Sequence, residues 1–322
     1  MATRNKSNVL RLTRVYNAPV QAVWDAWTDL EQVAQWWGPR GFTITTHSKD
    51  LRAGGTWVYT MHGPDGTDYP NIATYFVVKE RETLEYDHGA SEGKPALFRV
   101  HVGFSESNGK TTMDMTMTLA TPEAAEEIEK HIKKASGYST WDRLGEYLEE
   151  GQSGKATFVI NRSFDISVER MFEMWTDPKH FPQWLPPTGM EMQILRGEIK
   201  QGSSIFWLMT GPHMKLYGRF EYKEVRRPDR ISYTQQFCDE NEGVSRHPYA
   251  PTWPETMLTT VDLTPEGPEQ TRLTVRMEPY GPATSEEIEA FLLARGGMTQ
   301  GWTGSFDKFD EVLAKLADAR EL

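Results

Sequence analysis

The sequence predicts an α+β protein with two tandem copies of one domain, each an antiparallel β-sheet closed by a C-terminal helix. Three observations support this prediction. The 322 residues exceed one ordinary domain and suit two of about 150 residues each. The chain resembles itself at a fixed offset. Each half also has alternating apolar segments followed by a stretch with helical periodicity.

The internal repeat is visible when the sequence is shifted by 148 positions, which places segment 14–64 on segment 162–212 without a gap. Rare residues then coincide: Trp27 with Trp175, Trp36 with Trp184, and Gly63-Pro64 with Gly211-Pro212. Tryptophan is too infrequent for such a set to coincide at one offset by chance. We therefore infer a duplication.

The ends of the two halves match at a different offset, and this difference locates an insertion. Segment 142–148 parallels segment 307–313 at an offset of 165, so the second half is about seventeen residues longer. The acidic, then proline- and aromatic-rich stretch 238–254 is the expected insert. We predict domains at 8–150 and 155–322, joined by a short polar linker at 151–154.

The opening of each half predicts a strand and two short helices. Strands are expected at 10–16 and 157–164, and a helix at 19–28, where apolar residues recur at helical spacing. Asp29 and Gln32 resemble a capping box that starts a second short helix ending near Trp37. Further strands are expected around 56–61, 72–78, 83–88, 98–104 and 112–119, with a hairpin at Gly63–Gly66.

The last part of each half predicts the helix that closes the sheet. In the first half an apolar stripe runs from Ile128 to Leu148 and includes Trp141. In the second half the stripe runs from Ile288 to Leu313, and Gly296-Gly297 is expected to kink or interrupt the helix. A sheet with one apolar face buries it against such a helix, and the space between them would be lined by aromatic residues and methionine.

Composition excludes several classes of function. The net charge of −11 disfavours nucleic acid and anionic lipid as partners, and no apolar run approaches the length of a membrane span. The N-terminus lacks the apolar region of a signal peptide. The single cysteine fits a reducing compartment. We therefore expect a soluble, cytoplasmic protein without membrane insertion.

Candidate ligand-binding residues are the large apolar side chains, and a few polar ones, that point from strands and helices into the predicted interior. The alternative interpretation is that they only fill a core. In the first half they are Trp27, Trp57, Tyr59, Met61, Tyr75, Tyr86, His88, Met115, Tyr138 and Trp141. In the second half they are Trp175, Trp207, Met209, Phe220, Tyr233, Gln235, Met277, Trp302 and Phe306.

Catalytic and metal chemistry finds little support in the residue pattern. Glu127 and His131 are four positions apart on a predicted helix, but no third metal ligand accompanies them. The acidic neighbours of Cys238 are expected to raise its pKa and weaken it as a nucleophile. We predict no catalytic residue, metal or cofactor. The segment 247–254 is interpreted as a surface excursion, a lid over the second cavity or a contact with the first domain.

Several motifs resemble a known family: Ala18-Pro19-Val20, Trp27-Thr28-Asp29, Trp36-Trp37-Gly38-Pro39, Gly54-Gly55-Thr56-Trp57 and Gly63-Pro64-Asp65-Gly66. They look like the activator-of-heat-shock-ATPase-homologue branch of the SRPBCC superfamily, which includes START and birch-pollen-allergen-like domains. The resemblance covers nearly the whole chain, twice. It implies tandem helix-grip domains, in which a curved antiparallel sheet wraps around a long C-terminal helix.

The second copy departs from these motifs, which weakens the expectation of a shared ligand. Leu185-Pro186 replaces Trp37-Gly38, and Ser203-Ser204-Ile205 replaces Gly55-Thr56-Trp57. The family's eukaryotic co-chaperone has a further binding domain ahead of this one, which the sequence does not show, so a chaperone partner is not favoured.

Three hypotheses follow from the residues and the resemblance. The preferred one is a binding protein for a small apolar or amphipathic molecule, with a possible link to stress. The second is a cyclase- or hydrolase-like enzyme that uses a Tyr or His in the pocket. The third is a co-chaperone-like interaction module whose cavities are only cores.

Overall fold

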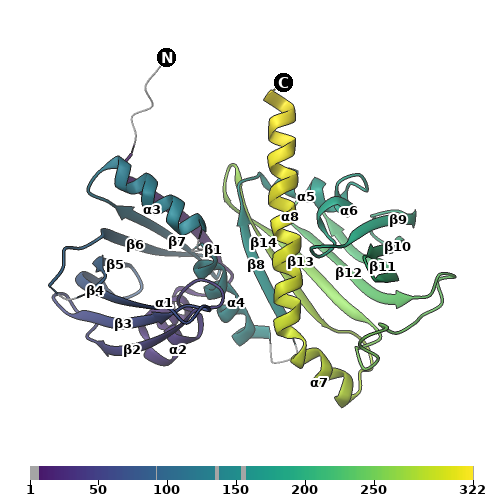
Figure 1. Cartoon of the computed structure of the whole chain (residues 1–322), viewed down its shortest axis with the longest axis horizontal. Coiled ribbons are helices and arrows are strands. Elements are labelled where there is room, and N and C mark those ends of the chain that lie inside the picture. Colours follow the sequence, from purple (N-terminus) through teal and green to yellow (C-terminus); the bar gives the residue numbers. More distant parts are fainter. Residues whose placement is uncertain (1–6, 92, 135–137, 154–156, 322) are drawn as a thin grey trace. The chain divides into compact units, whose positions relative to one another are not determined.

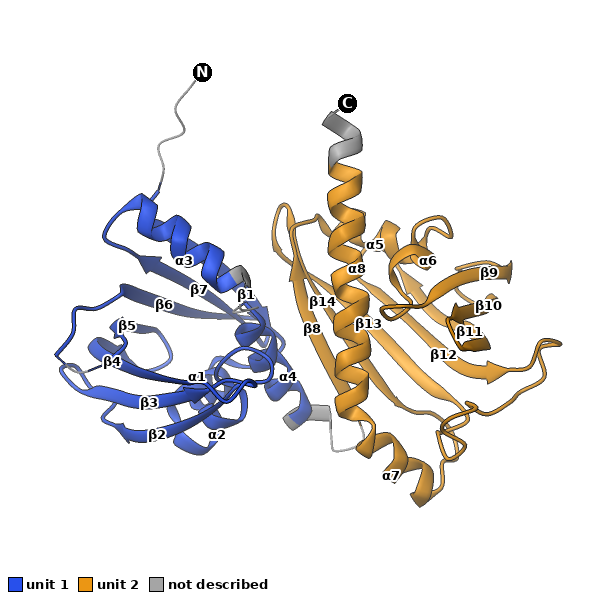
Figure 2. Ribbon diagram, in the orientation of Figure 1, with its two compact units in different colours: residues 1–152 blue, residues 153–322 orange. Residues whose placement is uncertain are grey.

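The chain divides into two compact units, residues 1–152 and 153–322, in a computed structural model (Figure 2). The structure describes residues 7–91, 93–134, 138–153 and 157–321. The predicted linker begins inside the last helix of the first unit, which ends at Ser153, and its residue Gly154 lies outside the described residues. Each unit is one repeat, and the two are called the first and second repeat below.

The first repeat has the predicted order of a strand, two short helices, further strands and closing helices (Figure 1). Its elements are β1 (Val9–Tyr16), α1 (Val20–Thr28), α2 (Leu30–Trp36), β2 (Thr43–Lys49), β3 (Thr56–His62), β4 (Asp68–Lys79), β5 (Thr83–Gly89), β6 (Phe98–Ser107), β7 (Lys110–Thr118), α3 (Pro122–Lys134) and α4 (Ser139–Ser153).

The second repeat follows the same order with different lengths. Its elements are β8 (Phe158–Phe164), α5 (Val168–Thr176), α6 (Phe181–Trp184), β9 (Glu191–Gly197), β10 (Ser204–Gly211), β11 (Met214–Arg226), β12 (Arg230–Cys238), β13 (Met257–Gly267), β14 (Gln270–Pro279), α7 (Ser285–Leu293) and α8 (Arg295–Glu321). The loop between β12 and β13 spans 239–256, where the first repeat has 90–97, so it holds much of the extra length.

Each repeat contains one seven-stranded antiparallel sheet, and the two sheets have equivalent strand orders. These are β1-β7-β6-β5-β4-β3-β2 and β8-β14-β13-β12-β11-β10-β9. The pairing register also shifts at equivalent places, between Tyr75 and Val77 on β4 and between Tyr222 and Glu224 on β11. Such bulges bend and twist a strand, so both sheets are curved at the same positions. The tandem helix-grip prediction is confirmed.

The two short helices of each repeat are held against the sheet by apolar contacts and caps. The Asp29 side chain accepts hydrogen bonds from the backbone N–H of Glu31 and Gln32, which starts α2 as the sequence predicts. The indole N–H of Trp36 donates to the Ala26 carbonyl, and that of Trp184 donates to the Met174 carbonyl, each at 3.0 Å. These equivalent bonds fix the angle between the two short helices in both repeats.

The closing segment of the first repeat differs from the expected single stripe, because α3 and α4 are separate helices. Ala135, one residue of the predicted stripe, lies outside the described residues. The stripe is therefore divided: Ile128 and Ile132 are half-buried on α3, whereas Leu144 and Leu148 of α4 belong to the core under the sheet. Helical periodicity alone does not reveal such a break.

The closing segment of the second repeat has a break, although two residues earlier than predicted. Helix α7 ends at Leu293 with Ala294 as its C-cap, while Gly296 and Gly297 lie in the first turn of α8. Figure 1 shows α8 lying across the face of the second sheet. Its buried residues Phe306 and Phe309 pack on Phe164 with ring centroids 5.7 and 4.9 Å apart. None of the helices in the described residues has the length and apolar character needed to span a membrane.

The sequence did not predict the edge strands β2 and β9, which form the outer end of each sheet. The β2 segment, Thr43–Lys49, is rich in polar side chains, and its residues are exposed or half-buried. Edge strands bury little apolar surface, so they lack the strong apolar alternation on which strand prediction depends.

Candidate functional site

The register of the strands shows which interior positions correspond in the two repeats. In the first repeat Trp57 pairs with Ala73, which pairs with His88 on the next strand. In the second repeat the same sequence of pairs is Ile205, Phe220 and Gln235. His88 and Gln235 therefore occupy equivalent places. By the same register Tyr75 corresponds to Tyr222, and Tyr86 to Tyr233.

The interior of the first repeat is occupied by a tryptophan cluster, defined as Trp27, Trp36, Trp37, Trp57 and Trp141. Trp141 from α4 stacks on Trp27 from α1, with ring centroids 5.5 Å apart. Trp37 lies edge-on between Trp57, at 5.0 Å, and Trp141, at 6.0 Å. Aromatic pairs at such distances stabilise a core beyond simple burial. This cluster joins the closing helix to the short helices and the sheet.

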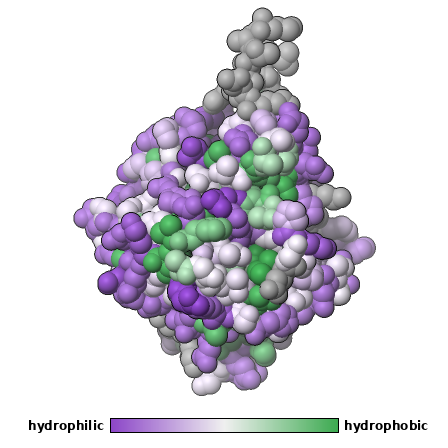
Figure 3. Space-filling model, turned by 90° about the vertical axis from the view of Figure 1, so that its left-hand side faces the viewer, coloured by the Kyte–Doolittle hydropathy of each residue, from purple (hydrophilic) through white to green (hydrophobic). Residues whose placement is uncertain are grey.

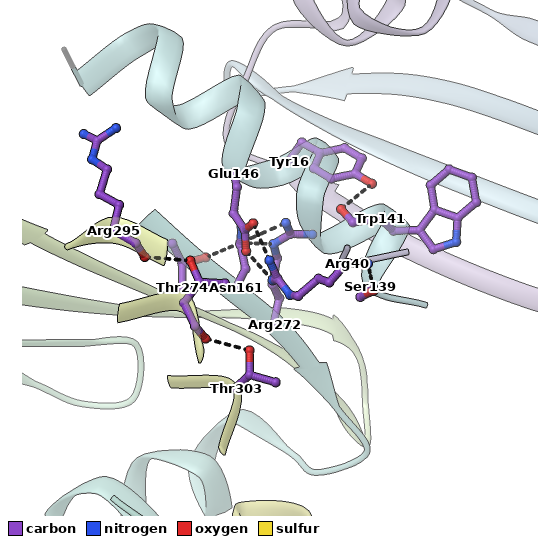
Figure 4. Close-up of polar contacts among 11 residues, drawn as sticks. Tyr16, Arg40, Ser139, Trp141, Glu146, Asn161, Arg272, Thr274, Arg295 and Thr303 are labelled. Carbon is purple, nitrogen blue, oxygen red and sulfur yellow. Dashed lines mark hydrogen bonds and ion pairs between the residues drawn. The ribbon is translucent and has the colours of Figure 1, made fainter. Parts of the chain in front are cut away.

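Polar contacts fix α4 over this cluster (Figure 4). The Tyr16 hydroxyl donates to the Trp141 carbonyl oxygen at 3.3 Å, and Arg40 forms a two-pronged ion pair with Glu146 on α4, with Nη1 2.8 Å from Oε2. Arg143 Nη1 donates to the Gly38 carbonyl at 2.7 Å. The second repeat uses Lys308 at the matching position, with Nζ 2.8 Å from the Met190 carbonyl oxygen. In both repeats, therefore, a cation on the closing helix donates to carbonyl oxygens in the loop that follows the second short helix.

Titratable groups in the first repeat are buried beside the tryptophan cluster. Burial raises the pKa values of Tyr59, Tyr75 and Tyr86 above the usual range of a phenol, so these side chains are neutral. Burial also lowers the pKa of half-buried His88 to about 4. Its ring stacks on Phe98 with centroids 4.8 Å apart. A neutral, stacked imidazole is a packing group rather than a proton donor at neutral pH.

One further cation borders the tryptophan cluster and was missed by the sequence analysis. Lys49, on β2, donates from Nζ to the Trp27 carbonyl at 3.0 Å, and the same nitrogen lies 4.6 Å from the centre of the Trp57 ring. Burial lowers the pKa of Lys49 to about 8. Its edge strand has a weak sequence signal, so the position of Lys49 near the interior could not be inferred.

The second repeat contains a cavity of about 330 Å³ between its sheet and α8. The sheet side is formed by Trp207 and Met209 on β10, Phe220 on β11, Tyr233 and Gln235 on β12, and Met277 on β14. The helix side is a stripe of α8 at helical spacing: Met298, Gly301, Trp302 and Ser305. This volume lies at the lower end of the range for small-molecule sites.

The loop between β12 and β13 contributes His247 and Trp253 to the wall of the cavity. Trp253 packs against Phe291 of α7 with ring centroids 5.7 Å apart, and Arg246 bridges the Trp253 carbonyl and the Glu287 carboxylate at 2.7 Å each. These contacts hold the loop against α7 at the edge of the cavity. Burial lowers the pKa of His247, so its ring is neutral at pH 7.

The polar side chains that line the cavity differ in whether they have a hydrogen-bond partner within the protein. The Ser305 hydroxyl donates to the Leu185 carbonyl at 2.7 Å, and the Trp302 indole N–H points to the Met277 sulfur at 3.3 Å. The Trp207 indole N–H is buried and has no hydrogen-bond partner among the described residues. Its ring lies directly over Gly218, where any Cβ atom would fall 2.1 Å from Cζ2. Glycine at this position is thus required by the placement of Trp207.

The predicted site residues separate into two groups in each repeat. Seven of the second-repeat residues line the cavity, namely Trp207, Met209, Phe220, Tyr233, Gln235, Met277 and Trp302. Trp175 and Phe306 pack behind Trp302, with centroids 6.4 and 5.6 Å from it. In the first repeat Trp27, Trp57, Tyr59, Tyr75, Tyr86 and Met115 are core residues, while Met61, His88, Tyr138 and Trp141 are partly exposed.

Other lining residues were not predicted, because their position depends on the tertiary structure. They include Leu185, Pro187 and Met190 from the segment after α6, Met214 and Leu216 from β11, and Phe237 from β12. The sequence could have indicated Leu185 as a lining residue, because it aligns with the larger Trp37 of the first repeat. A smaller residue at an interior position leaves space.

Two further kinds of site were considered in the sequence, a reactive cysteine and a metal-binding cluster. Burial is the main cause that raises the pKa of Cys238, with Glu242 and Asp239 adding to it and Arg219 opposing it. The sequence analysis had attributed this shift to acidic neighbours alone. Within the described residues, no three His, Cys, Asp or Glu side chains are grouped so that they could hold a metal ion.

The surface of the first repeat presents several large apolar side chains, including Leu30, Tyr69, Phe76 and Leu97. On the face shown in Figure 3, apolar atoms form separate patches divided by polar side chains. A continuous apolar patch is the usual mark of a protein-docking face, and this view shows a divided one.

Several solved structures are similar to this chain or to about half of it. A protein from Staphylococcus epidermidis is 27% identical, with a match covering 47% of this chain and 95% of that one and a TM-score of 0.41. Ms6760 from Mycobacterium smegmatis is 26% identical, covering 45% and 93% with a TM-score of 0.41. DynU16, from the dynemicin biosynthetic locus, is 16% identical, covering 95% and 99% with a TM-score of 0.34. No curated protein matches the chain.

The family assignment comes from the sequence model of the domain. The model of the activator of Hsp90 ATPase homolog 1-like proteins matches residues 17–149 and again residues 165–314. Together these two matches cover most of the chain and coincide with the two repeats. The chain therefore belongs to the family of activator of Hsp90 ATPase homolog 1-like proteins, with two copies of the family's domain in tandem.

Proposed function

We propose that the second repeat binds a small apolar molecule in the cavity between its sheet and α8. The observation that supports this most strongly is the cavity itself, which has about 330 Å³ of space walled by aromatic and methionine side chains. Apolar surface around such a space gains favourable contacts when an apolar molecule fills it. Methionine adapts to irregular shapes, so Met209, Met214 and Met298 would fit around ligands of different outline.

The lid supports the same proposal. Trp253 and His247 come from the loop that the second repeat has lengthened, and the Arg246–Glu287 ion pair at 2.7 Å holds that loop to α7. A loop that adds two aromatic rings to a cavity wall shields its contents from water. We place this binding function in the cytoplasm, because the single cysteine fits a reducing compartment.

The test uses Gly301, which lies on α8 and lines the cavity. A Cβ atom at Gly301 would meet nothing within 4 Å, so Gly301→Leu would extend a side chain into open space without backbone strain. Leucine also favours helix over glycine by nearly 1 kcal/mol. The variant should therefore fold and should lose the ligand.

The measurement is calorimetric titration with naphthalene. We expect binding by the unaltered chain and binding weaker by about tenfold or more in Gly301→Leu, because leucine occupies the ligand's space. Gly297→Leu is the matched control, since Gly297 is on the same helix, is exposed and is equally free of steric conflict. Equal affinity in the unaltered chain and Gly301→Leu, or no binding by the unaltered chain, would contradict the proposal.

A further inference from the structure

Strand β12 carries two consecutive glutamines, Gln235 and Gln236, whose side chains lie on opposite faces of the second sheet. Successive side chains of a strand alternate between its two faces. Gln235 lines the cavity together with Tyr233 and Phe237, the residues two positions before and after it on the strand. Gln236 therefore belongs to the face that is turned away from the cavity. The same kind of side chain meets two different surroundings.

The outward-facing Gln236 has hydrogen-bond partners at both ends of its amide. Its Oε1 accepts a hydrogen bond from Arg219 Nη2 at 2.8 Å, and its Nε2 donates to Thr256 Oγ1 at 2.9 Å. A glutamine amide carries an acceptor and a donor on one planar group, and here the protein itself supplies a partner for each. Gln236 is thus a structural residue of the sheet.

The inward-facing Gln235 amide has no hydrogen-bond partner among the described residues. In the sheet Gln235 lies between Phe220 on β11 and Met257 on β13, and neither of these side chains has a nitrogen or an oxygen. Gln235 is half-buried, and the buried polar atoms that lack a partner do not include its amide atoms. Both ends of this amide therefore remain accessible to water or to a ligand.

The chemistry of the wall restricts what this amide can recognise. Gln235 is the one carboxamide among the described residues that line the cavity, and none of them is Asp, Glu, Lys or Arg. An ion in this space would lose its hydration shell without meeting a counter-charge in the wall, which is unfavourable. A neutral primary amide or lactam presents an N–H and a carbonyl oxygen side by side, so it complements both ends of a glutamine amide at once.

We infer that the ligand of the second repeat is a neutral, largely apolar molecule with a carboxamide or lactam group, which forms a pair of hydrogen bonds with the Gln235 amide. The ligand N–H donates to Gln235 Oε1, and Gln235 Nε2 donates to the ligand carbonyl oxygen. The apolar body of the ligand lies among the aromatic and methionine side chains of the wall. This inference rests on the proposed binding function and narrows it to one class of ligand.

The experiment compares three ligands of similar size by calorimetric titration at pH 7. They are 2-naphthamide, with a donor and an acceptor; 2-acetylnaphthalene, with an acceptor only; and 2-isopropenylnaphthalene, with neither. The quantity of interest is the affinity for the amide divided by the affinity for the alkene. Gln235→Met keeps the length of the side chain and removes its amide. It should lower this ratio by about tenfold, which is the effect of losing two neutral hydrogen bonds, and the corresponding ratio for the ketone by about threefold.

Matched variants assign the effect to one side chain. Gln236→Met removes the neighbouring amide on the opposite face, and Tyr233→Phe and His247→Phe remove other polar groups from the wall. Each of these three should leave the ratio of amide to alkene affinity within about twofold of its value in the unaltered chain, since the Gln235 amide is still present. The assigned side-chain NH₂ signals of Gln235 in the unaltered chain give a second measurement. Addition of 2-naphthamide, and not of the alkene, should move them downfield.

The outcomes separate this inference from the proposed function. Binding of the ligands with a ratio that Gln235→Met leaves unchanged would overturn the inference and leave the binding function in place. A fall as large in Tyr233→Phe or His247→Phe as in Gln235→Met would also overturn it, as would Gln235 signals that do not respond to bound 2-naphthamide. Failure of all three ligands to bind the unaltered chain would contradict the binding function itself.

Discussion

The two repeats share a fold and differ in what occupies the space under the closing helix. In the first repeat Trp37 fills this space, with its ring between Trp57 and Trp141. In the second repeat the equivalents of Trp37 and Trp57 are Leu185 and Ile205, and Leu185 lines the cavity. The two sheets have equivalent strand orders although different side chains fill the space beneath them. The difference teaches that a few changes of side-chain volume alter how the space under the closing helix is filled in this fold.

The largest effect is expected where the first repeat depends on its tryptophan cluster. Trp141→Ala removes the ring that stacks on Trp27 at 5.5 Å and should destabilise the first repeat by about 3 kcal/mol. Native-state hydrogen exchange of the first-repeat strands measures this loss. Leu97→Ala, at a side chain that is 50% exposed, should change little. A change near zero in Trp141→Ala would show that α4 does not close the sheet through this ring.

A smaller effect is expected from making the first repeat resemble the second. Trp37→Leu introduces the residue found at Leu185 and should destabilise the first repeat by about 2 kcal/mol through the space it creates. That space should admit naphthalene. Calorimetry in a Gly301→Leu background, where the second cavity is filled, would isolate this new site. Loss of stability without any binding would mean that the first repeat collapses around the change.

The smallest effect concerns pH. His88 has a folded pKa of about 4, below its unfolded value, so the folded state resists protonation. Stability from the neutral ring is complete above about pH 6.5 and is lost as the pH falls toward 4. His88→Gln, which installs the residue found at Gln235, should reduce the loss of unfolding free energy between pH 7 and pH 5 by about 1 kcal/mol. The change is measured by urea unfolding at both pH values.

The control for this measurement is His101→Gln, an exposed position on β6. It should leave the acid sensitivity as it is, because the His101 side chain is exposed and is not buried in the interior. Equal acid sensitivity in His88→Gln and the unaltered chain would show that the His88 ring is open to water.

The sequence by itself determined the duplication, the order of most elements and the aromatic character of both interiors. Trp27 with Trp175 and Trp36 with Trp184 established the repeat, because a rare residue at a constant offset is a strong signal. Alternation along β7 and helical spacing along α8 depend on local periodicity, which the chain expresses directly. Seven of the nine residues predicted for the second repeat line its cavity, since they point inward from regular elements.

Only the tertiary structure revealed the cavity of the second repeat and the position of the loop that contributes His247 and Trp253 to its wall. The break between α3 and α4 and the edge strand β2 also escaped the sequence, because neither changes the local apolar pattern clearly. A cavity is a difference between the space that the backbone encloses and the volume of side chains from distant segments. Leu185, Trp207 and Trp253 meet only after folding, so no window of sequence contains their relation.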